Sequence, residues 1–142
     1  MKRSGFSMIE LMVVIVILGL LSVLIVPNVI GQSEQAKRKL ACVQMKNFVQ
    51  SIETFKLNNN DYPTTEQGLA ALVTNPDPDL YKNYLIGGYI KSVPKDPWGS
   101  DYIYLNDGGE IEIVSSGADR KEGGEDNNRD IKLSECETML SR

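Results

Sequence analysis

A single acidic residue, Glu10, stands at the start of the most apolar stretch of this 142-residue sequence. Residues 11–26 contain only Leu, Met, Val, Ile, one Gly and one Ser. A carboxylate at the edge of such a stretch is costly in lipid unless it is protonated, reaches the lipid surface or pairs with a cation. The candidate cations are Lys2, Arg3 and the α-amino group that cleavage before Phe6 would create. Glu10 is therefore a candidate for an ion pair, and a carboxylate that simply reaches water is the alternative.

A second set of candidate ligands lies in residues 116–130, which are rich in Gly and in acidic side chains. Five acids and three bases occur between residues 119 and 130. Oxygen ligands in a loop with enough Gly to turn them inward suit Ca²⁺. The ordered spacing and closing Glu of an EF-hand are missing. The residues alone favour a solvated loop over a metal site.

The composition excludes several kinds of chemistry. The chain has no His, so it lacks the commonest general base and the imidazole metal ligand. Its two Cys residues cannot form a zinc or iron–sulfur site by themselves. A net charge of -4 argues against a nucleic-acid partner. With no nucleophile–base pair and no phosphate loop, we expect a protein that is not an enzyme.

The N-terminal segment has the length and composition of a membrane helix. Leu11 to Ile30 spans about 20 residues, roughly 30 Å as a helix. Lys2 and Arg3 precede it, which favours a cytoplasmic N-terminus with the bulk of the chain on the opposite side. A cleaved secretory signal is the alternative, but residues 22–36 hold no convincing Ala-x-Ala site.

A second helical pattern follows directly. Ala41, Met45, Phe48, Ile52 and Phe55 recur on one helical face, which predicts packing against the rest of the domain. We expect one rod of about 50 residues that ends near residues 58–60, where Asn favours a turn. Proline and glycine at positions 27 and 31 are expected to loosen it. The basic residues 37–39 are expected to be solvated, with lipid headgroups as the alternative partner.

The remaining chain reads as a small mixed domain. Residues 68–73 predict a short helix, capped from residues 64–67. Alternation predicts strands over 101–105 and 110–114, joined by a hairpin turn at 106–109. Trp98, the single Trp, is expected to be buried against the long helix.

The N-terminal sequence Gly5-Phe6-Ser7-Met8-Ile9-Glu10 with its apolar run resembles the class III signal of type IV pilins and pseudopilins. In that family a prepilin peptidase cuts between the Gly and the Phe and then methylates the new amine. The resemblance implies that Gly5 ends the leader, that Phe6 becomes N-methylphenylalanine, and that Glu10 pairs with the Phe6 amine of a neighbouring subunit.

Residues 61–69, 88–90 and 94–99 narrow this resemblance to the major pseudopilins of type II secretion. The implied fold is α+β and type IV pilin-like, with a long N-terminal helix on a small antiparallel sheet and a C-terminal calcium loop. The expected parts are a cleaved leader (1–5), a hydrophobic transmembrane and assembly helix (6–30), an amphipathic half-helix (31–58) and a periplasmic globular domain (59–142).

The resemblance also implies one structural Ca²⁺ in residues 116–130. Arg120 and Asn127 depart from the residues usual in the family, which points to weaker binding or to recruitment of Glu125 or Asn128. The expected ligands are the side chains of Asp119, Asp126 and Asn127 and the backbone oxygens of Ser116, Lys121 and Gly124.

The tail, residues 132–142, continues beyond the point where the family usually stops. Cys136 lies in this tail and Cys42 on the flank of the helical stripe. Outside the cytoplasm the two residues can form a disulfide, which would tie the tail to the helix. Two unpaired buried thiols are the alternative.

The expected function is a subunit that polymerises into the periplasmic pseudopilus of a type II secretion system and supports export of folded proteins. Implied partners are other copies of the chain in a helical homopolymer, minor pseudopilins, the prepilin peptidase, the inner-membrane assembly platform with its ATPase, and membrane lipid before assembly. Before assembly the chain would be a single-pass inner-membrane protein with a periplasmic C-terminal domain. A type IV pilus subunit and a DNA-uptake pseudopilin are the alternatives.

Overall fold

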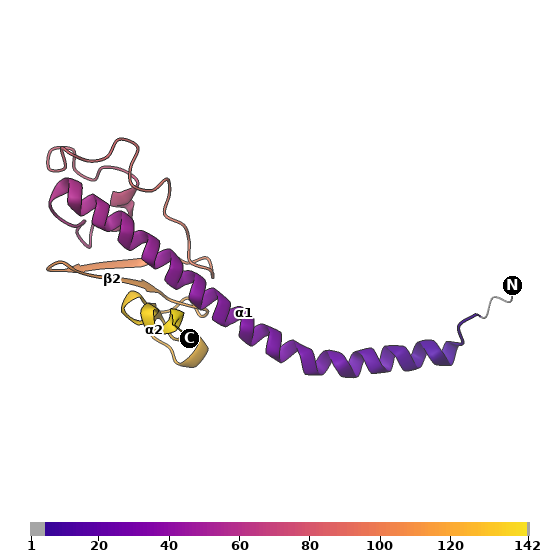
Figure 1. Ribbon diagram of the computed structural model, residues 1–142. Coiled ribbons are helices and arrows are strands. Elements are labelled where there is room, and N and C mark those ends of the chain that lie inside the picture. Colours follow the sequence, from indigo (N-terminus) through magenta and orange to yellow (C-terminus); the bar gives the residue numbers. More distant parts are fainter. Residues whose placement is uncertain (1–4, 142) are drawn as a thin grey trace. The chain divides into compact units, whose positions relative to one another are not determined.

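The computed structural model describes residues 5–141, with the backbone alone for residues 22–32 (Figure 1). A single helix, α1 (Met8–Asn59), accounts for 52 residues, which confirms the expected length and end of the N-terminal helix. The proline and glycine expected to loosen it lie at positions 27 and 31, outside the described side chains. The compact units are Met1–Gln35 and Ala36–Arg142, so the second half of α1 belongs to the same unit as the sheet.

The expected membrane segment, residues 6–30, includes residues 22–30, whose side chains are not described. Over the parts of the chain that the structure does describe, no helix has the length and apolar character needed to cross a membrane.

The apolar stripe on the second half of α1 forms the centre of the globular core. All five of its members are buried, and Phe55 is fully enclosed. The ring of Phe55 makes an edge contact with Tyr81 at 5.0 Å between centroids, and Phe48 makes one with Tyr102 at 5.3 Å. Trp98 is buried in the same core, as predicted. The helical period in the sequence therefore identified the buried face of α1 correctly.

Three antiparallel strands form one sheet in the order β1-β2-β3. They are β1 (Ile103–Asp107), β2 (Glu110–Ser115) and β3 (Ile131–Lys132). Figure 1 shows the β1–β2 hairpin running alongside the second half of α1. The core includes Tyr102 and Tyr104 from the hairpin together with the α1 stripe, so the expected helix-on-sheet arrangement is confirmed.

The first strand begins and ends two residues later than predicted, and the turn is shorter. Asp107 pairs with Glu110, which leaves Gly108 and Gly109 as a two-residue turn with φ of 59° and 100°. Asn106, expected in the turn, instead lies in β1, where it pairs with Ile111 of β2, and its side-chain amide donates to the Pro63 carbonyl at 2.9 Å. Paired glycines with positive φ match the twist of a tight hairpin.

The segment between α1 and β1 is mostly irregular and holds one 3-10 helix, η1 (Leu69–Leu72). Thr64 and Gln67 accept hydrogen bonds from each other's backbone N–H, at 3.0 and 3.2 Å, and so close the turn that precedes η1. The N-cap residue of η1 is Gly68, which has no side-chain cap hydrogen bond, so the predicted cap of this helix is wrong. Gly88 packs directly on the end of η1, where a Cβ would lie 2.6 Å from the Val73 carbonyl oxygen. Only glycine tolerates this approach together with its φ of 80°.

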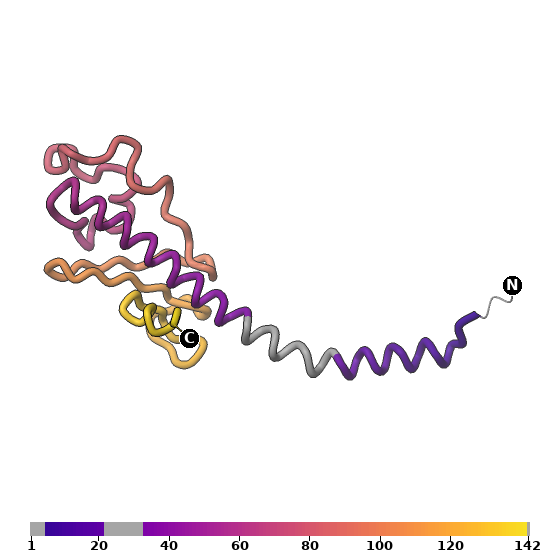
Figure 2. The backbone as a smooth tube through the Cα atoms, in the orientation of Figure 1, coloured from indigo at the N-terminus to yellow at the C-terminus, as the bar shows by residue number. Residues whose placement is uncertain are grey.

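The C-terminal tail contributes elements that the sequence pattern did not predict. After β3 come a 3-10 helix, η3 (Leu133–Glu135), and a short helix, α2 (Cys136–Leu140). β3 pairs with the end of β2 through Ser115–Ile131 and Val114–Lys132. The acidic loop, residues 116–130, therefore leaves one strand and returns to the next strand of the same sheet (Figure 2).

Candidate functional site

The expected processing point lies in an exposed, non-helical segment before α1. Gly5 and Phe6 are both exposed, and no atom lies within 4 Å of a Cβ placed on Gly5. The side chain of Phe6 is 84% exposed. The Gly5–Phe6 peptide bond is therefore accessible to a peptidase.

Glu10 caps the start of α1 within its own chain. Its Oε2 accepts a hydrogen bond from the Ser7 backbone N–H at 3.1 Å, and Ser7 Oγ accepts one from the Ile9 N–H at 3.4 Å. Ser7 and Glu10 thus have the spacing of a capping box, in which an acid on the first turn satisfies a free backbone donor. The sequence signal for this role of Glu10 is the Ser-x-x-Glu pattern of residues 7–10.

Residues 8–21, at the start of α1, present apolar side chains on every side, and these side chains are exposed. Large apolar residues from Phe6 to Leu21 are between 49% and 84% exposed. Monomeric proteins rarely leave so much contiguous apolar surface in water. The arrangement is suited to burial in lipid or against other helices.

The acidic loop is held in a tight conformation by its own backbone. Asp130 and Gly123 close it with two bonds: the Asp130 N–H donates to the Gly123 carbonyl at 3.1 Å, and Asp130 Oδ2 accepts from the Gly123 N–H at 3.0 Å. Gly124 lies so close to Asn128 that a Cβ would come within 2.4 Å of the Asn128 carbonyl oxygen. Gly124 is therefore required by the closure of the loop.

The expected calcium ligands differ in environment. Ser116 is buried, Asp119 is partly buried, and Asp126 and Asn127 are exposed, with Asp126 opening the 3-10 helix η2 (Asp126–Asn128). Asp119 Oδ1 accepts a hydrogen bond from the Lys121 N–H at 3.1 Å. Nowhere among the described residues do three His, Cys, Asp or Glu side chains gather as a metal-binding group. The expected set of calcium ligands contains only two acidic side chains, those of Asp119 and Asp126, together with Asn127 and backbone oxygens.

Two acidic residues that the sequence analysis did not single out occupy key positions near the loop. Asp130 has one buried carboxylate oxygen, Oδ1, that makes no hydrogen bond. Asp96 is buried and accepts hydrogen bonds from the Ser100 N–H at 2.7 Å and the Ser115 hydroxyl at 2.6 Å. The Ser115 hydroxyl in turn accepts from the Gly117 N–H at 3.2 Å, so this network reaches the loop entrance.

Arg38 was grouped with solvated basic residues, and the structure gives it a specific partner. Its guanidinium donates to the Arg129 carbonyl at 2.8 Å, across 91 positions of sequence. Arg38 precedes Ala41 by three residues and Met45 by seven, so it continues the face of the apolar stripe, but the helical period does not indicate which backbone carbonyl its side chain contacts.

The structure joins Cys42 and Cys136 in a disulfide, with 5.4 Å between their Cα atoms. Both residues are fully buried. Met45 Sδ packs 3.8 Å from Cys136 Sγ, and Met139 Sδ lies 4.0 Å from Cys42 Sγ. The disulfide therefore ties α2, and with it the tail, to the buried face of α1.

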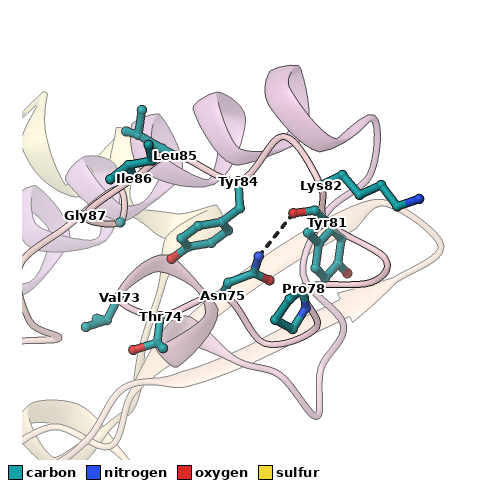
Figure 3. A pocket seen from close by; sticks show the side chains of 11 residues that line it. Val73, Thr74, Asn75, Pro78, Tyr81, Lys82, Tyr84, Leu85, Ile86 and Gly87 are labelled. Carbon is teal, nitrogen blue, oxygen red and sulfur yellow. Dashed lines mark hydrogen bonds between the residues drawn. The ribbon is translucent and has the colours of Figure 1, made fainter.

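An open hollow of about 480 Å³ lies between residues 73–75 and 78–88 (Figure 3). Two of its polar side chains are bonded within the fold: the Asn75 amide donates to the Tyr81 carbonyl at 3.1 Å, and the Tyr84 hydroxyl donates to the Ala71 carbonyl at 2.9 Å. Burial, with a smaller effect of neighbouring Tyr89, raises the pKa of Tyr84. These groups hold the irregular segment together and are not arranged as reacting partners.

Two buried tyrosines of the hairpin have strongly perturbed hydroxyls. Burial raises the pKa of Tyr102, with a further contribution from the charge of Asp96. Burial is also the main cause of the raised pKa of Tyr104, whose hydroxyl donates to the Pro63 carbonyl at 2.9 Å. Both phenols therefore act as structural donors that stay protonated.

Two family descriptions match this sequence. Residues 28–134 match the family described as "Type II secretion system (T2SS), protein G". Residues 1–26 match the "Prokaryotic N-terminal methylation motif".

The chain is similar along most of its length to named relatives. It is 48% identical to "Type II secretion system core protein G" of Vibrio cholerae serotype O1, covering 92% of this chain and 90% of the relative. It is 47% identical to the protein of that description from Pseudomonas aeruginosa, covering 92% of this chain and 94% of the relative. A crystal structure described as the major pseudopilin from the type 2 secretion system of enterohaemorrhagic Escherichia coli is 39% identical and superposes with a TM-score of 0.63. That match covers 72% of this chain and 86% of the other.

Proposed function

The chain belongs to the family of type II secretion system protein G, whose members are structural pseudopilin subunits and not enzymes, and from this we propose how its parts carry out assembly. The observation that carries the proposal is that α1 exposes apolar side chains on every side over residues 8–21, while one face of its second half is buried in a compact domain. Such a chain covers its apolar half by packing it into lipid or against identical helices. We propose that it stacks into a helical homopolymer, the pseudopilus, and so supports export of folded proteins.

Processing of the N-terminus is the first step that we propose. Prepilin peptidase cuts the exposed Gly5–Phe6 bond and methylates the Phe6 amine. The match of residues 1–26 to an N-terminal methylation motif supports this, as does the non-helical geometry before Met8. Mass spectrometry of the chain from its native envelope tests the step: a methylated Phe6 is expected, and retention of residues 1–5 would contradict it.

We propose that Glu10 has two roles that use different oxygens. Oε2 caps its own helix through Ser7, and the remaining acceptor capacity takes the Phe6 amine of a neighbouring subunit. Opposite charges in an apolar assembly attract strongly, whereas either one left alone is penalised. The pair then aligns adjacent subunits along the filament.

The Glu10 proposal is tested by replacing Glu10 with Leu or Gln and measuring pseudopilus formation and secretion in cells. Both variants are expected to abolish assembly while the globular domain remains folded. Glu66→Gln removes an equally charged but exposed acid of the globular domain and serves as the matched control. Assembly at the wild-type level by Glu10→Leu would contradict the proposal.

Before assembly, we propose that residues 6–30 anchor the chain in the inner membrane. Support comes from the uninterrupted apolar composition of residues 11–26 and from the basic residues at positions 2 and 3. The globular domain then lies in the periplasm, where a Cys42–Cys136 disulfide is chemically stable. The proposed partners are minor pseudopilins and an inner-membrane platform driven by its ATPase.

We propose that the acidic loop binds one Ca²⁺ through Asp119, Asp126 and Asn127, with backbone oxygens of Ser116, Lys121 and Gly124. The unpaired, buried oxygen of Asp130 supports the fit, because a buried carboxylate oxygen without a donor is costly unless a cation is near. Bound Ca²⁺ would supply positive charge that offsets the carboxylates of the loop. The side chains orient the loop, and Gly123 and Gly124 allow its backbone to turn inward.

Calcium binding is tested by thermal unfolding in EDTA and then in excess Ca²⁺. A ligand that binds only the folded state raises the melting temperature, by an amount that grows with ligand concentration. The Asp119→Asn variant is expected to lose most of this shift, whereas Glu110→Gln, an exposed acid of the hairpin, is expected to keep it. An identical melting curve in EDTA and in Ca²⁺ would remove the proposal.

A further inference from the structure

The side chain of Arg38 attaches the exit of the acidic loop to α1. Its Nη1 donates hydrogen bonds to two backbone carbonyls, that of Arg129 at 2.8 Å and that of Asn127 at 3.5 Å. Both acceptors are backbone atoms of the last residues of the loop. A charged donor makes a stronger hydrogen bond to a carbonyl than a neutral one does.

The Arg129 carbonyl is also the point where the two ends of the loop meet. Gly117, at the entrance, packs so closely there that a Cβ would lie 3.2 Å from the Arg129 oxygen. Ser115 and Ile131 pair immediately beyond it as the last rung between β2 and β3. Arg38 therefore contacts the loop where its entrance and its exit lie side by side, so that its hydrogen bond restrains the backbone of both ends.

The position of Arg38 on α1 places this contact beside the disulfide. Arg38, Cys42 and Met45 follow one another at helical spacing on one face of α1. Cys42 fixes the tail through Cys136 at the next turn of the helix. The tail is held covalently, whereas the loop exit depends on hydrogen bonds that include those from Arg38.

We propose that Arg38 is a positioning residue that holds the acidic loop closed on α1 in the metal-free protein, and that it thereby preorganises the loop for Ca²⁺. The second part rests on the calcium binding proposed above. Arginine suits this role because its guanidinium is a fixed fork with several donors, whereas a lysine ammonium is a single flexible point. Closing the loop beforehand reduces the ordering that the cation must otherwise impose.

An electrostatic alternative makes the opposite prediction for calcium. A positive charge near the loop repels Ca²⁺, so removing it would strengthen binding if charge were its main effect. Positioning predicts weaker binding on the same substitution. Arg38→Met removes both the charge and the donors while keeping an apolar stem. Arg38→Lys keeps the charge and N–H donors but loses the fixed fork of the guanidinium.

The experiment uses the full chain in detergent micelles and the variants Arg38→Met, Arg38→Lys and Lys39→Met. Lys39 is the neighbouring exposed base, so its substitution removes an equal charge without the loop contact. Hydrogen exchange is measured first in EDTA at the Asn128, Arg129 and Asp130 amides, which bond within the loop. In the second measurement, each variant is titrated with Ca²⁺ alone, and isothermal calorimetry gives the calcium dissociation constant.

In EDTA, Arg38→Met is expected to exchange these amides about tenfold faster than wild type, with the melting temperature of the core unchanged. Its calcium dissociation constant is expected to rise about tenfold, with Arg38→Lys between the two and Lys39→Met like wild type. Wild-type exchange rates in Arg38→Met, or tighter calcium binding by it, would overturn the inference. If the wild type binds no calcium, both the proposed calcium site and its preorganisation by Arg38 are overturned. The exchange rates in EDTA then still decide whether Arg38 holds the loop closed.

Discussion

Loss of the Cys42–Cys136 disulfide is expected to be the most damaging change to the globular unit that leaves its apolar core intact. The bond joins residues 94 positions apart, so it removes a large part of the freedom of the unfolded chain. For a loop of this length the chain-entropy relation gives a contribution of about 4.7 kcal/mol at room temperature. That is a large fraction of the stability of a typical domain.

The perturbation is the double variant Cys42→Ala with Cys136→Ala, which avoids placing polar serine hydroxyls in a site that is fully buried in the native fold. Urea unfolding can be followed through Trp98, the single Trp, which is buried in the core. With a urea dependence of about 2 kcal/mol per molar, the midpoint is expected to fall by about 2 M. Thr138→Ala, an exposed change on α2, is the control and is expected to shift the free energy of unfolding by less than about 0.5 kcal/mol.

Two results would refute this reasoning. A fall of less than about 1 kcal/mol in the double variant would mean that the bond does not constrain the cooperative unit that Trp98 reports. An equal fall in Thr138→Ala would mean that packing of α2, rather than the covalent bond, stabilises the fold. Thiol labelling of the unfolded wild type is expected to find no free Cys.

Three further predictions concern the globular unit. Gly88→Ala is expected to destabilise it by about 3 kcal/mol in urea unfolding, because the new Cβ meets the Val73 carbonyl at 2.6 Å and φ is positive; an unchanged midpoint would contradict this close approach. Asp96→Asn is expected to lower the free energy of unfolding by about 2 kcal/mol, because the carboxylate accepts several hydrogen bonds and the amide would place an N–H donor against one of the groups that now donate to it. An unchanged free energy of unfolding would contradict this. The raised pKa values of Tyr102 and Tyr104 mean that the folded state keeps phenol protons that the unfolded state loses at about pH 10, so the free energy of unfolding is expected to fall as the pH rises above that value. Urea unfolding at several pH values, with phenolate absorbance measured in parallel, checks this. Titration of all tyrosines at about pH 10 in the folded protein would refute it.

Local sequence patterns predicted the main elements correctly. The helical recurrence from Ala41 to Phe55 identified the buried face of α1, and the residues around Gly108 identified a hairpin. These signals are local because a helix repeats every few residues and a tight turn needs specific backbone angles. The strand limits were less accurate, since pairing of Asn106 with Ile111 and of Asp107 with Glu110 extended β1 into the expected turn.

In the candidate site, too, local motifs were visible in the sequence and long-range contacts were not. The motif around Phe6 and Glu10 was visible as a contiguous pattern, although the capping bond between Ser7 and Glu10 was overlooked. The attachment of the loop by Arg38 was not predicted, because its partner carbonyl is 91 residues away and any residue type could supply it. Backbone acceptors have no signature in sequence, so only their placement in space reveals such a contact.

The sequence by itself determined the apolar N-terminal segment, the amphipathic period of α1, the turn glycines and the membership of the family, because each depends on residues close together in the chain. The tertiary structure alone decided that Cys42 meets Cys136, that β3 returns to β2, and that Asp96 binds Ser115. The physical reason is that these contacts join segments whose approach depends on how the whole core packs around α1, and no local pattern of side chains encodes that approach.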